Sequence, residues 1–304
     1  KISVKIKNSS IFIEGKAGNY IPPKKYSTRF FFEIVEPFLK KIFYSSKPGR
    51  MSWEDAFNKI MNENDIPAYQ QIKFDDKKII AKNISECKKI FPFKYAINKH
   101  YIRSYYFINI LCSYIDLTKT KFIAEIGAGS GNLLSLLKYH FSPKSIIDID
   151  LPETLTLSIP FLKNLFPDSK ILLPNEINQK INYEILQNYD FVFLTPNQIK
   201  DLEENLVDLF INTGSFQEMH MSQIEKYLNA IQKVAKKDSF FFNSNRVEKV
   251  PYDGKKNEDY SKIKPTRFSE YPFFKNDILL IEICRFSNLT QDHPLYTRLE
   301  KIIK

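Results

Sequence analysis

Residues 125–134 read EIGAGSGNLL, and this stretch decides the fold of the chain. Three glycines alternate with small residues, after a short apolar run and before a leucine-rich segment. The apolar run KFIAEIG predicts a strand, and the segment NLLSLLKYHF predicts a helix. The glycines therefore form a turn between a strand and a helix, where they permit a ligand to approach the backbone closely.

Strand and helix patterns alternate on both sides of this loop. Helices are predicted at 97–115, 132–141, 152–166 and 223–237. Strands are predicted at 121–127, 145–150, 170–174, 190–196, 207–213, 238–243 and 276–286. Pro152 suits the first turn of its helix, Ser222 with Glu225 is expected to cap the last helix, and the strand at 276–286 is expected to be the final one. Continuously apolar strands that alternate with helices predict an α/β fold, a parallel sheet covered on both faces.

The first part of the chain follows a different pattern. Helical spacing at 53–65 and 77–91 predicts a mainly helical region. The stretch SIFIEGKAGNY predicts a short hairpin that turns at 15–18. We therefore divide the chain into a mainly helical region at 1–96, interpreted as a lid over an acceptor, and an α/β domain at 97–304.

Charge and cysteine content narrow the partners and the compartment. The chain of 304 residues carries a net charge of +10, which indicates either acidic partners or a lysine-rich solvated surface. Cys87, Cys112 and Cys284 are too far apart for a metal motif or a disulfide framework, so a cytoplasmic location is expected. No apolar run reaches the ~20 residues that span a bilayer. The chain begins with Lys1 rather than Met, so we expect further residues to precede it.

Two nucleotide-binding motifs fit the glycine loop poorly. A phosphate-binding P-loop ends in Gly-Lys-Ser or Gly-Lys-Thr, whereas Gly131 is followed by Asn132 and Leu133. A dinucleotide fingerprint places its third glycine three residues after the second, where this chain has Asn132. The loop is therefore expected to hold a different ligand.

Acidic residues beside the loop indicate a cationic ligand. Glu125 would repel a pyrophosphate, but it attracts the sulfonium and ammonium groups of S-adenosylmethionine (SAM). Asp150 ends the next predicted strand about 20 residues further on, where an acid accepts hydrogen bonds from ribose hydroxyls. Asp148 competes for this role on the same face of the strand, and we prefer Asp150 because it is terminal. The expected cofactor is SAM.

Three further residues are candidates for contacts with the donor. Arg103, on the helix before the loop, has the geometry to pair with the SAM carboxylate, although a solvated helix residue is the alternative. Asn212 and Thr213 end a strand and would position the donor or the acceptor, while Asn212 would equally well satisfy backbone groups there. The residues expected to contact SAM are thus Glu125, Gly127, Ala128, Gly129, Gly131, Asp150, Leu151, Asn212, Thr213 and Arg103.

Residues 95–290 resemble the class I SAM-dependent methyltransferases, through AEIGAGSGNLL and IDIDLPETL. The segments DIDLPETL, DLFINTGSFQEM and FSEYPF are further similar to a family of sugar O-methyltransferases from bacterial surface-polysaccharide clusters. The resemblance implies a Rossmann-like class I methyltransferase fold, with a mostly parallel seven-stranded sheet whose last strand is antiparallel. It also implies methyl transfer to a sugar hydroxyl in capsule or lipopolysaccharide biosynthesis.

Acceptor chemistry is expected after the strand at 207–213. In-line transfer needs the acceptor oxygen aligned with the methyl group, and a sugar hydroxyl needs a nearby base. His220 is the first candidate for this base because histidine exchanges protons near neutral pH, and an ordinary polar residue before a helix is the alternative. Glu218 is the second candidate, and its alternative role is a capping box with Ser215.

Four residues further along are candidates for acceptor binding. The guanidinium groups of Arg246 and Arg267 are each suited to bind a phosphate or carboxylate on the acceptor. Tyr271 and Phe268 are suited to stack on a sugar ring, and buried packing is the alternative for both aromatic side chains. No metal is expected, because the strand before the acceptor region ends on Asn212 where metal-dependent enzymes often have Asp.

Three other functions share the predicted fold. A SAM-dependent methyltransferase acting on RNA is disfavoured, because residues 212–215 read NTGS rather than the Asn/Asp-Pro-Pro-Tyr/Phe of base-methylating enzymes. Methylation of a small metabolite and a non-catalytic SAM-fold partner subunit stay open. The expected partner is a carbohydrate acceptor, either a nucleotide sugar or a glycan, and not a nucleic acid or an integral membrane segment. A homo-oligomer is compatible with the sequence.

Overall fold

The computed structural model describes residues 3–7, 10–14, 99–250, 264–284 and 293–304, with side chains from residue 103 onward. The helices predicted at 53–65 and 77–91 lie outside the described residues. The division between 1–96 and the rest of the chain therefore stays a prediction.

A short antiparallel hairpin near the start of the chain is described by itself. Its strands are β1 (Ser3–Lys7) and β2 (Ser10–Glu14), and Lys7 lies opposite Ser10. SIFIE is the second strand of this pair, and the turn predicted at 15–18 lies outside the described residues. The preceding segment SVKIK also alternates apolar and polar residues, and it supplies the partner strand.

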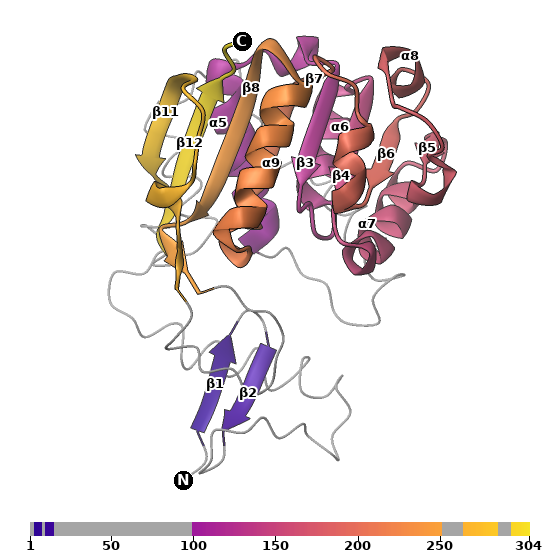
Figure 1. Cartoon of the computed structure of the whole chain (residues 1–304). Coiled ribbons are helices and arrows are strands. Elements are labelled where there is room, and N and C mark those ends of the chain that lie inside the picture. Colours follow the sequence, from indigo (N-terminus) through magenta and orange to yellow (C-terminus); the bar gives the residue numbers. More distant parts are fainter. Residues whose placement is uncertain (1–2, 8–9, 15–98, 251–263, 285–292) are drawn as a thin grey trace, which may run out of the picture. The chain divides into compact units, whose positions relative to one another are not determined.

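The α/β part is built on one eight-stranded sheet in the order β11-β12-β8-β7-β3-β4-β6-β5 (Figure 1). Its strands are β3 (Phe122–Ile126), β4 (Ser145–Ile149), β5 (Ile171–Leu172), β6 (Phe191–Leu194), β7 (Val207–Thr213), β8 (Ala235–Arg246), β11 (Asp277–Ile283) and β12 (Leu295–Lys301). The six strands from β8 to β5 run parallel. The predicted Rossmann-like class I methyltransferase fold is confirmed, with one strand more than the seven expected.

The additional strand is β12, and it changes the end of the predicted topology. β12 pairs antiparallel with both β8 and β11, so the last strand is antiparallel as expected. The prediction that 276–286 forms the final strand is wrong, because β12 follows it. The segment LYTRLEK carries Arg298 and Glu300 among its apolar residues, and these two charged side chains pair with each other inside the fold. A buried charged pair of this kind interrupts the apolar pattern from which a strand is predicted, so this strand was missed.

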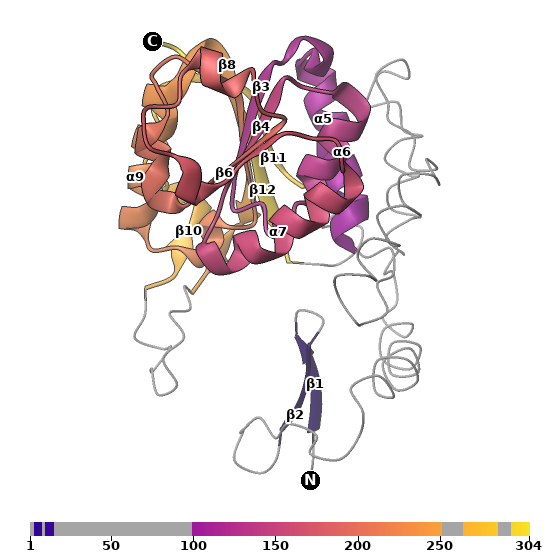
Figure 2. The same cartoon turned by 90° about the vertical axis from the view of Figure 1, so that its right-hand side faces the viewer.

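Helices cover both faces of the sheet, as predicted (Figure 2). Their bounds are α5 (Lys99–Tyr114), α6 (Asn132–Phe141), α7 (Pro152–Leu165), α8 (Tyr183–Leu186) and α9 (Met221–Val234). One hydrophobic cluster joins α5, α6 and α7 to one face, and a second joins α9 to the other. Every residue of β3 and β4 is buried, which is the burial expected of a parallel sheet covered on both sides.

The two ends of α9 differ from the prediction. Its N-cap is His220, so Ser222 lies within the first turn and the predicted Ser222–Glu225 cap is wrong. The helix ends at Val234, and β8 begins at the next residue. The carbonyl of Val234 accepts a hydrogen bond from the amide of Leu206, at 2.7 Å, and this bond draws the chain into the sheet three residues before the predicted end of the helix.

A small ribbon of β9 (Glu248–Lys249) and β10 (Thr266–Arg267) lies beyond the end of β8. In the described part of the chain, none of the helices combines the length and the apolar character that a membrane crossing requires.

Candidate functional site

The glycine loop joins β3 to α6 at the carboxyl edge of the sheet. Gly127, Gly129 and Gly131 have φ angles of 75°, 62° and 80°, in the left-handed region that favours glycine. The amide of Gly127 donates to the carbonyl of Ile149 at 2.8 Å, which ties the loop to the end of β4. The tight turn predicted from the sequence is therefore present, and it lies at the edge where α/β sheets bind ligands.

The three glycines have different surroundings. A β-carbon at position 127 would lie 2.3 Å from Oγ of Ser215, and one at position 131 would lie 3.2 Å from a methyl group of Leu162. A β-carbon at position 129 would meet no atom within 4 Å. Gly127 and Gly131 therefore permit close packing within the protein, whereas Gly129 borders open space.

Glu125 lies beneath the loop, shielded from solvent. It is 1% exposed, and the hydroxyl of Thr213 donates to its Oε1 at 3.2 Å. Burial, followed by the neighbouring charges of Asp148 and Asp150, raises the pKa of Glu125 to about 8. Glu125, the acid predicted from the sequence, is thus buried beside the loop, where its ionised carboxylate is disfavoured.

Asp150 and Asp148 have separate environments, although both are on the strand that enters the site. Asp150 is partly exposed at the edge, and it accepts hydrogen bonds from the amides of Gly129, at 2.8 Å, and Leu151, at 2.7 Å. Burial raises the pKa of Asp150, and these two amides oppose that effect. Asp148 is 1% exposed and accepts a hydrogen bond from the hydroxyl of Ser158 at 2.6 Å. Of the two acids, Asp150 is the one that reaches the open edge.

Asn212 lies inside the fold at the end of β7. Its amide nitrogen donates to the carbonyl of Ile126, at 2.9 Å, and to Oγ of Ser215. Its oxygen accepts a hydrogen bond from the side chain of Asn245 at 2.7 Å. The side chain therefore satisfies backbone and loop groups, which is the second of the two roles expected for it, while Thr213 contacts Glu125.

The candidate bases follow β7 on an exposed segment. His220 is exposed, and its carbonyl accepts the first hydrogen bonds of α9. Glu218 is also exposed, forms an ion pair with Lys249 of β9, and accepts a hydrogen bond from the side chain of Gln217. The capping box expected between Ser215 and Glu218 is absent from the 3₁₀ turn Phe216–Glu218, because the hydroxyl of Ser215 donates instead to the carbonyl of Ile126.

Buried amides near this segment are functional candidates that the sequence patterns missed. Asn245 donates to Asn212 and accepts a hydrogen bond from the amide of Gln217 at 3.0 Å. The side-chain oxygen of Gln217 in turn accepts from the amide of Arg246 at 2.8 Å. The signal was the run NSNR, which places polar side chains at the carboxyl end of the otherwise apolar β8.

The predicted acceptor-binding residues are only partly brought together. Tyr271 is 5% exposed and packs against Phe216, at 6.1 Å between ring centroids, and against Phe268, at 5.1 Å. Its ring thus has the buried packing that was the alternative to stacking on a sugar. Arg267 is exposed and pairs with Glu248, at 2.9 Å, and with Glu270, at 3.3 Å.

The two remaining arginines lie in different parts of the fold. Arg246 is partly exposed at the carboxyl end of β8, close to Gln217. Arg103 lies on α5 with its guanidinium 6.0 Å from the centre of the Phe107 ring. The structure therefore groups Arg246 with the segment that follows β7, and it holds Arg103 against an aromatic ring of its own helix.

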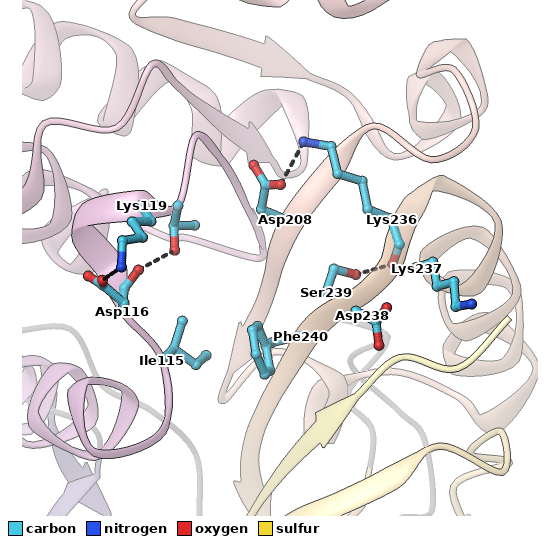
Figure 3. A pocket seen from close by; sticks show the side chains of 10 residues that line it. Ile115, Asp116, Lys119, Asp208, Lys236, Lys237, Asp238, Ser239 and Phe240 are labelled. Atoms are coloured by element: carbon cyan, nitrogen blue, oxygen red, sulfur yellow. Dashed lines mark hydrogen bonds and ion pairs between the residues drawn. The ribbon is translucent and has the colours of Figure 1, made fainter.

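A hollow of about 280 Å³ opens at the amino ends of the strands, and its lining contains no residue of the glycine loop (Figure 3). Its lining charges largely neutralise one another, since Lys119 pairs with Asp116 at 2.8 Å and Lys236 pairs with Asp208 at 2.6 Å. Within the described residues, no group of three or more His, Cys, Asp or Glu side chains is placed to hold a metal ion.

No protein-family model matches the chain, and no curated protein is similar to it in sequence. Solved structures are similar in fold. The PH0226 protein from Pyrococcus horikoshii OT3 is 14% identical, with 71% of this chain and 98% of that chain covered and a TM-score of 0.44. A SAM dependent methyltransferase from Archaeoglobus fulgidus is 13% identical, with 61% and 87% covered and a TM-score of 0.37. At these identities and TM-scores the likeness carries no conclusion about function. The topology and the loop geometry make SAM the expected cofactor.

Proposed function

We propose that the chain is a SAM-dependent O-methyltransferase that methylates a sugar hydroxyl, on a nucleotide sugar or a glycan of a bacterial capsule or lipopolysaccharide. The observation that carries this proposal is the glycine loop, whose open position at Gly129 is hydrogen-bonded to the accessible carboxyl of Asp150, while the buried carboxyl of Glu125 lies on the strand that leads into the loop. Two acids beside an open backbone turn suit a ligand that carries both a cationic group and ribose hydroxyls.

Each residue of the loop has a defined part in holding the donor. Bound SAM would supply a methyl group on a positively charged sulfur. Asp150 would accept hydrogen bonds from the ribose hydroxyls, Gly129 would allow the nucleoside to approach the backbone, and the exposed side chain of Leu151 would contact the adenine. Glu125 balances the positive charge from below the loop, with Thr213 holding its carboxyl in position.

The proton of the acceptor hydroxyl is taken by a base on the segment after β7. His220 is the first candidate, because its exposed side chain follows the strand end and is free to turn toward an acceptor. Glu218 is the second, and its ion pair with Lys249 must open before its carboxylate reaches a hydroxyl. Gln217 and Asn245 hold this segment against β8.

The sugar acceptor is supported by the contacts between two of the segments that resemble sugar O-methyltransferases. The ring of Phe216 packs on Tyr271, and the hydroxyl of Thr266, two residues before FSEYPF, donates to the carbonyl of Met219 at 2.7 Å. The segments INTGSFQEM and FSEYPF thus form one wall beside the end of β7. Arg246, at the end of β8, borders the same wall and would bind a phosphate of a nucleotide sugar.

The test has two stages. First, titration calorimetry should detect binding of SAM and of its product, and not of NAD; binding of NAD in place of SAM would overturn the proposal. Second, labelled SAM is incubated with a panel of nucleotide sugars, extracted glycans, small metabolites and RNA. Label transferred to a sugar hydroxyl supports the proposal, and label found only on RNA or only on a metabolite contradicts its sugar acceptor.

A further inference from the structure

A row of four side chains crosses the sheet beside the glycine loop. In register, Ile211 of β7 lies beside Glu125 of β3, Glu125 beside Asp148 of β4, and Asp148 beside Phe193 of β6. Neighbouring strands are about 4.8 Å apart, and side chains in register point to the same face of a parallel sheet. Two carboxyl groups therefore lie side by side, with an apolar side chain on each flank.

Each of these carboxyl groups is buried and has one oxygen without a hydrogen-bond donor. Glu125 and Asp148 are both 1% exposed. Thr213 donates to Oε1 of Glu125 and Ser158 donates to Oδ2 of Asp148, but among the described residues Oε2 of Glu125 and Oδ1 of Asp148 have no partner. An ionised carboxylate only accepts hydrogen bonds, so two ionised groups would leave two adjacent buried acceptors unsatisfied.

One shared proton satisfies both unpartnered oxygens, because it turns one of them into a hydrogen-bond donor to the other. We propose that Glu125 and Asp148 share one proton in the donor-free protein, and that Asp148 thereby sets the charge that Glu125 presents to the donor. This inference rests on the proposed function, in which Glu125 balances the donor cation. Asp148 is a positioning residue in this scheme, since it acts through Glu125.

The charged groups on the strand favour the shared proton. Burial and the neighbouring Asp148 raise the pKa of Glu125 to about 8, and burial likewise raises the pKa of Asp148 to about 8. Asp150, two residues along β4, adds to the effect on both groups. The adjacent strands contribute no charge to this row, because β7 and β6 present Ile211 and Phe193.

The helices packed over this face bring few charges to the pair. Arg103 of α5 lies against Phe107, and Glu153 in the first turn of α7 is exposed. The charged and titratable groups of α6, Lys138, Tyr139 and His140, are in its last turn, at the end away from the glycine loop. Besides burial, the protonation of the pair therefore depends chiefly on its own two carboxyls and on Asp150.

The consequence is an exchange of protons with the donor. A cationic donor stabilises the ionised form of Glu125, so its binding releases the shared proton to solvent. The product of methyl transfer has a neutral sulfur, so it stabilises that form less and the proton returns to the pair. The protein would thus distinguish the donor from the product by their charge, in addition to their shape.

The first arm of the test needs no ligand. Thermal unfolding of the full chain is followed from about pH 6 to about pH 9, where the native pair binds a proton that the unfolded chain does not. We expect the Tm of the parent to fall with rising pH, and the Tm of Asp148→Asn to stay level, because an amide donates to Glu125 at every pH. Asp190→Asn, at the amino end of β6, is the matched control and should keep the parental slope. Glu125→Gln serves as a second variant and should also abolish the slope.

The second arm measures proton release by titration calorimetry in phosphate and in Tris at about pH 7. The parent is expected to release about one proton per SAM and clearly less with S-adenosylhomocysteine, and Asp148→Asn is expected to release none. SAM binding without proton release, or a Tm slope that Asp148→Asn retains, overturns the inference while leaving the proposed function intact. If SAM does not bind at all, the proposed function fails, and the unfolding arm alone decides whether the pair shares a proton.

Discussion

Asp150 at the end of β4 accepts a hydrogen bond from the amide of Gly129 at the tip of the glycine loop, at 2.8 Å. The same carboxyl also accepts from the amide of Leu151, so it joins the loop to the start of α7. One side chain thus fixes the shape of the edge and supplies an acid at the open position of that edge.

Replacement of Asp150 by Ala should weaken SAM binding. The variant loses hydrogen bonds made by a charged acceptor, which contribute about 1.5–3 kcal/mol, and therefore about a tenfold to hundredfold loss of affinity is expected. Titration calorimetry with SAM measures the change, and the loss of a similar factor for S-adenosylhomocysteine would agree with a contact to the ribose they share. Unchanged affinity for both ligands would contradict the assigned role of Asp150.

Two glycine substitutions should differ in their effect on stability. Gly127→Ala meets Oγ of Ser215 at 2.3 Å and also adopts a left-handed φ, whereas Gly129→Ala meets no atom within 4 Å and bears only the strain of the backbone. That strain costs about 1–2 kcal/mol. Chemical unfolding should therefore show the larger loss for Gly127→Ala, and Ser215→Gly in the same chain should recover part of it.

Gly129→Ala should instead act on ligand binding. The added methyl group points into the open space at the loop, where the nucleoside is proposed to approach. SAM affinity is expected to fall more than stability does, which is the opposite order from Gly127→Ala. If the loss of SAM affinity relative to the loss of stability were the same in Gly129→Ala and Gly127→Ala, the space at Gly129 would not be used by a ligand.

Replacement of His220 by Ala should lower kcat by about a hundredfold or more, because a general base commonly contributes a factor of this size. SAM affinity should be unchanged, since His220 lies on the segment after β7 rather than on the glycine loop. Glu218→Gln provides the comparison, and steady-state kinetics with an acceptor identified from the panel measures both. A large loss in Glu218→Gln together with near-parental turnover in His220→Ala would reverse the assignment.

Asp190 should contribute to stability in a pH-dependent way. Burial opposes ionisation, but Lys138 Nζ, at 2.6 Å, and the amide of Lys170, at 2.9 Å, outweigh it and lower the pKa of Asp190. A lowered pKa means that the stabilisation is present at neutral pH and is lost as the pH falls through the native pKa. Asp190→Asn should therefore lose up to about 1 kcal/mol in urea unfolding near pH 7 and match the parent near pH 3.

The glycine loop and the acids beside it were predictable because each depends on local order along the chain. The strand, the glycine turn and the helix are formed by consecutive residues, so the local sequence predicts them. Asp150 was predicted from its place at the end of the next strand. The side-by-side position of Glu125 and Asp148 was not predictable in the same way, because it depends on which strands become neighbours and in which register.

The errors have a similar physical origin. Ser222 is a good capping residue in isolation, but the hydrogen bonds that begin α9 go to the carbonyl of His220. Tyr271 was a candidate for stacking on a sugar, and the rings of Phe216 and Phe268 surround it instead. In each case tertiary contacts overrode a residue preference that was correct on average.

The insertion of β12 between β8 and β11 has a consequence for synthesis of the chain. β11 leaves the ribosome before β12, which is the strand that joins it to the rest of the sheet. Until β12 emerges, β11 therefore has no partner strand on either edge. An unpaired apolar strand is prone to associate with other chains. A nonsense mutation just before Leu295 would remove β12 and leave β11 unpaired outside the sheet. We expect such a truncated product to be found in inclusion bodies.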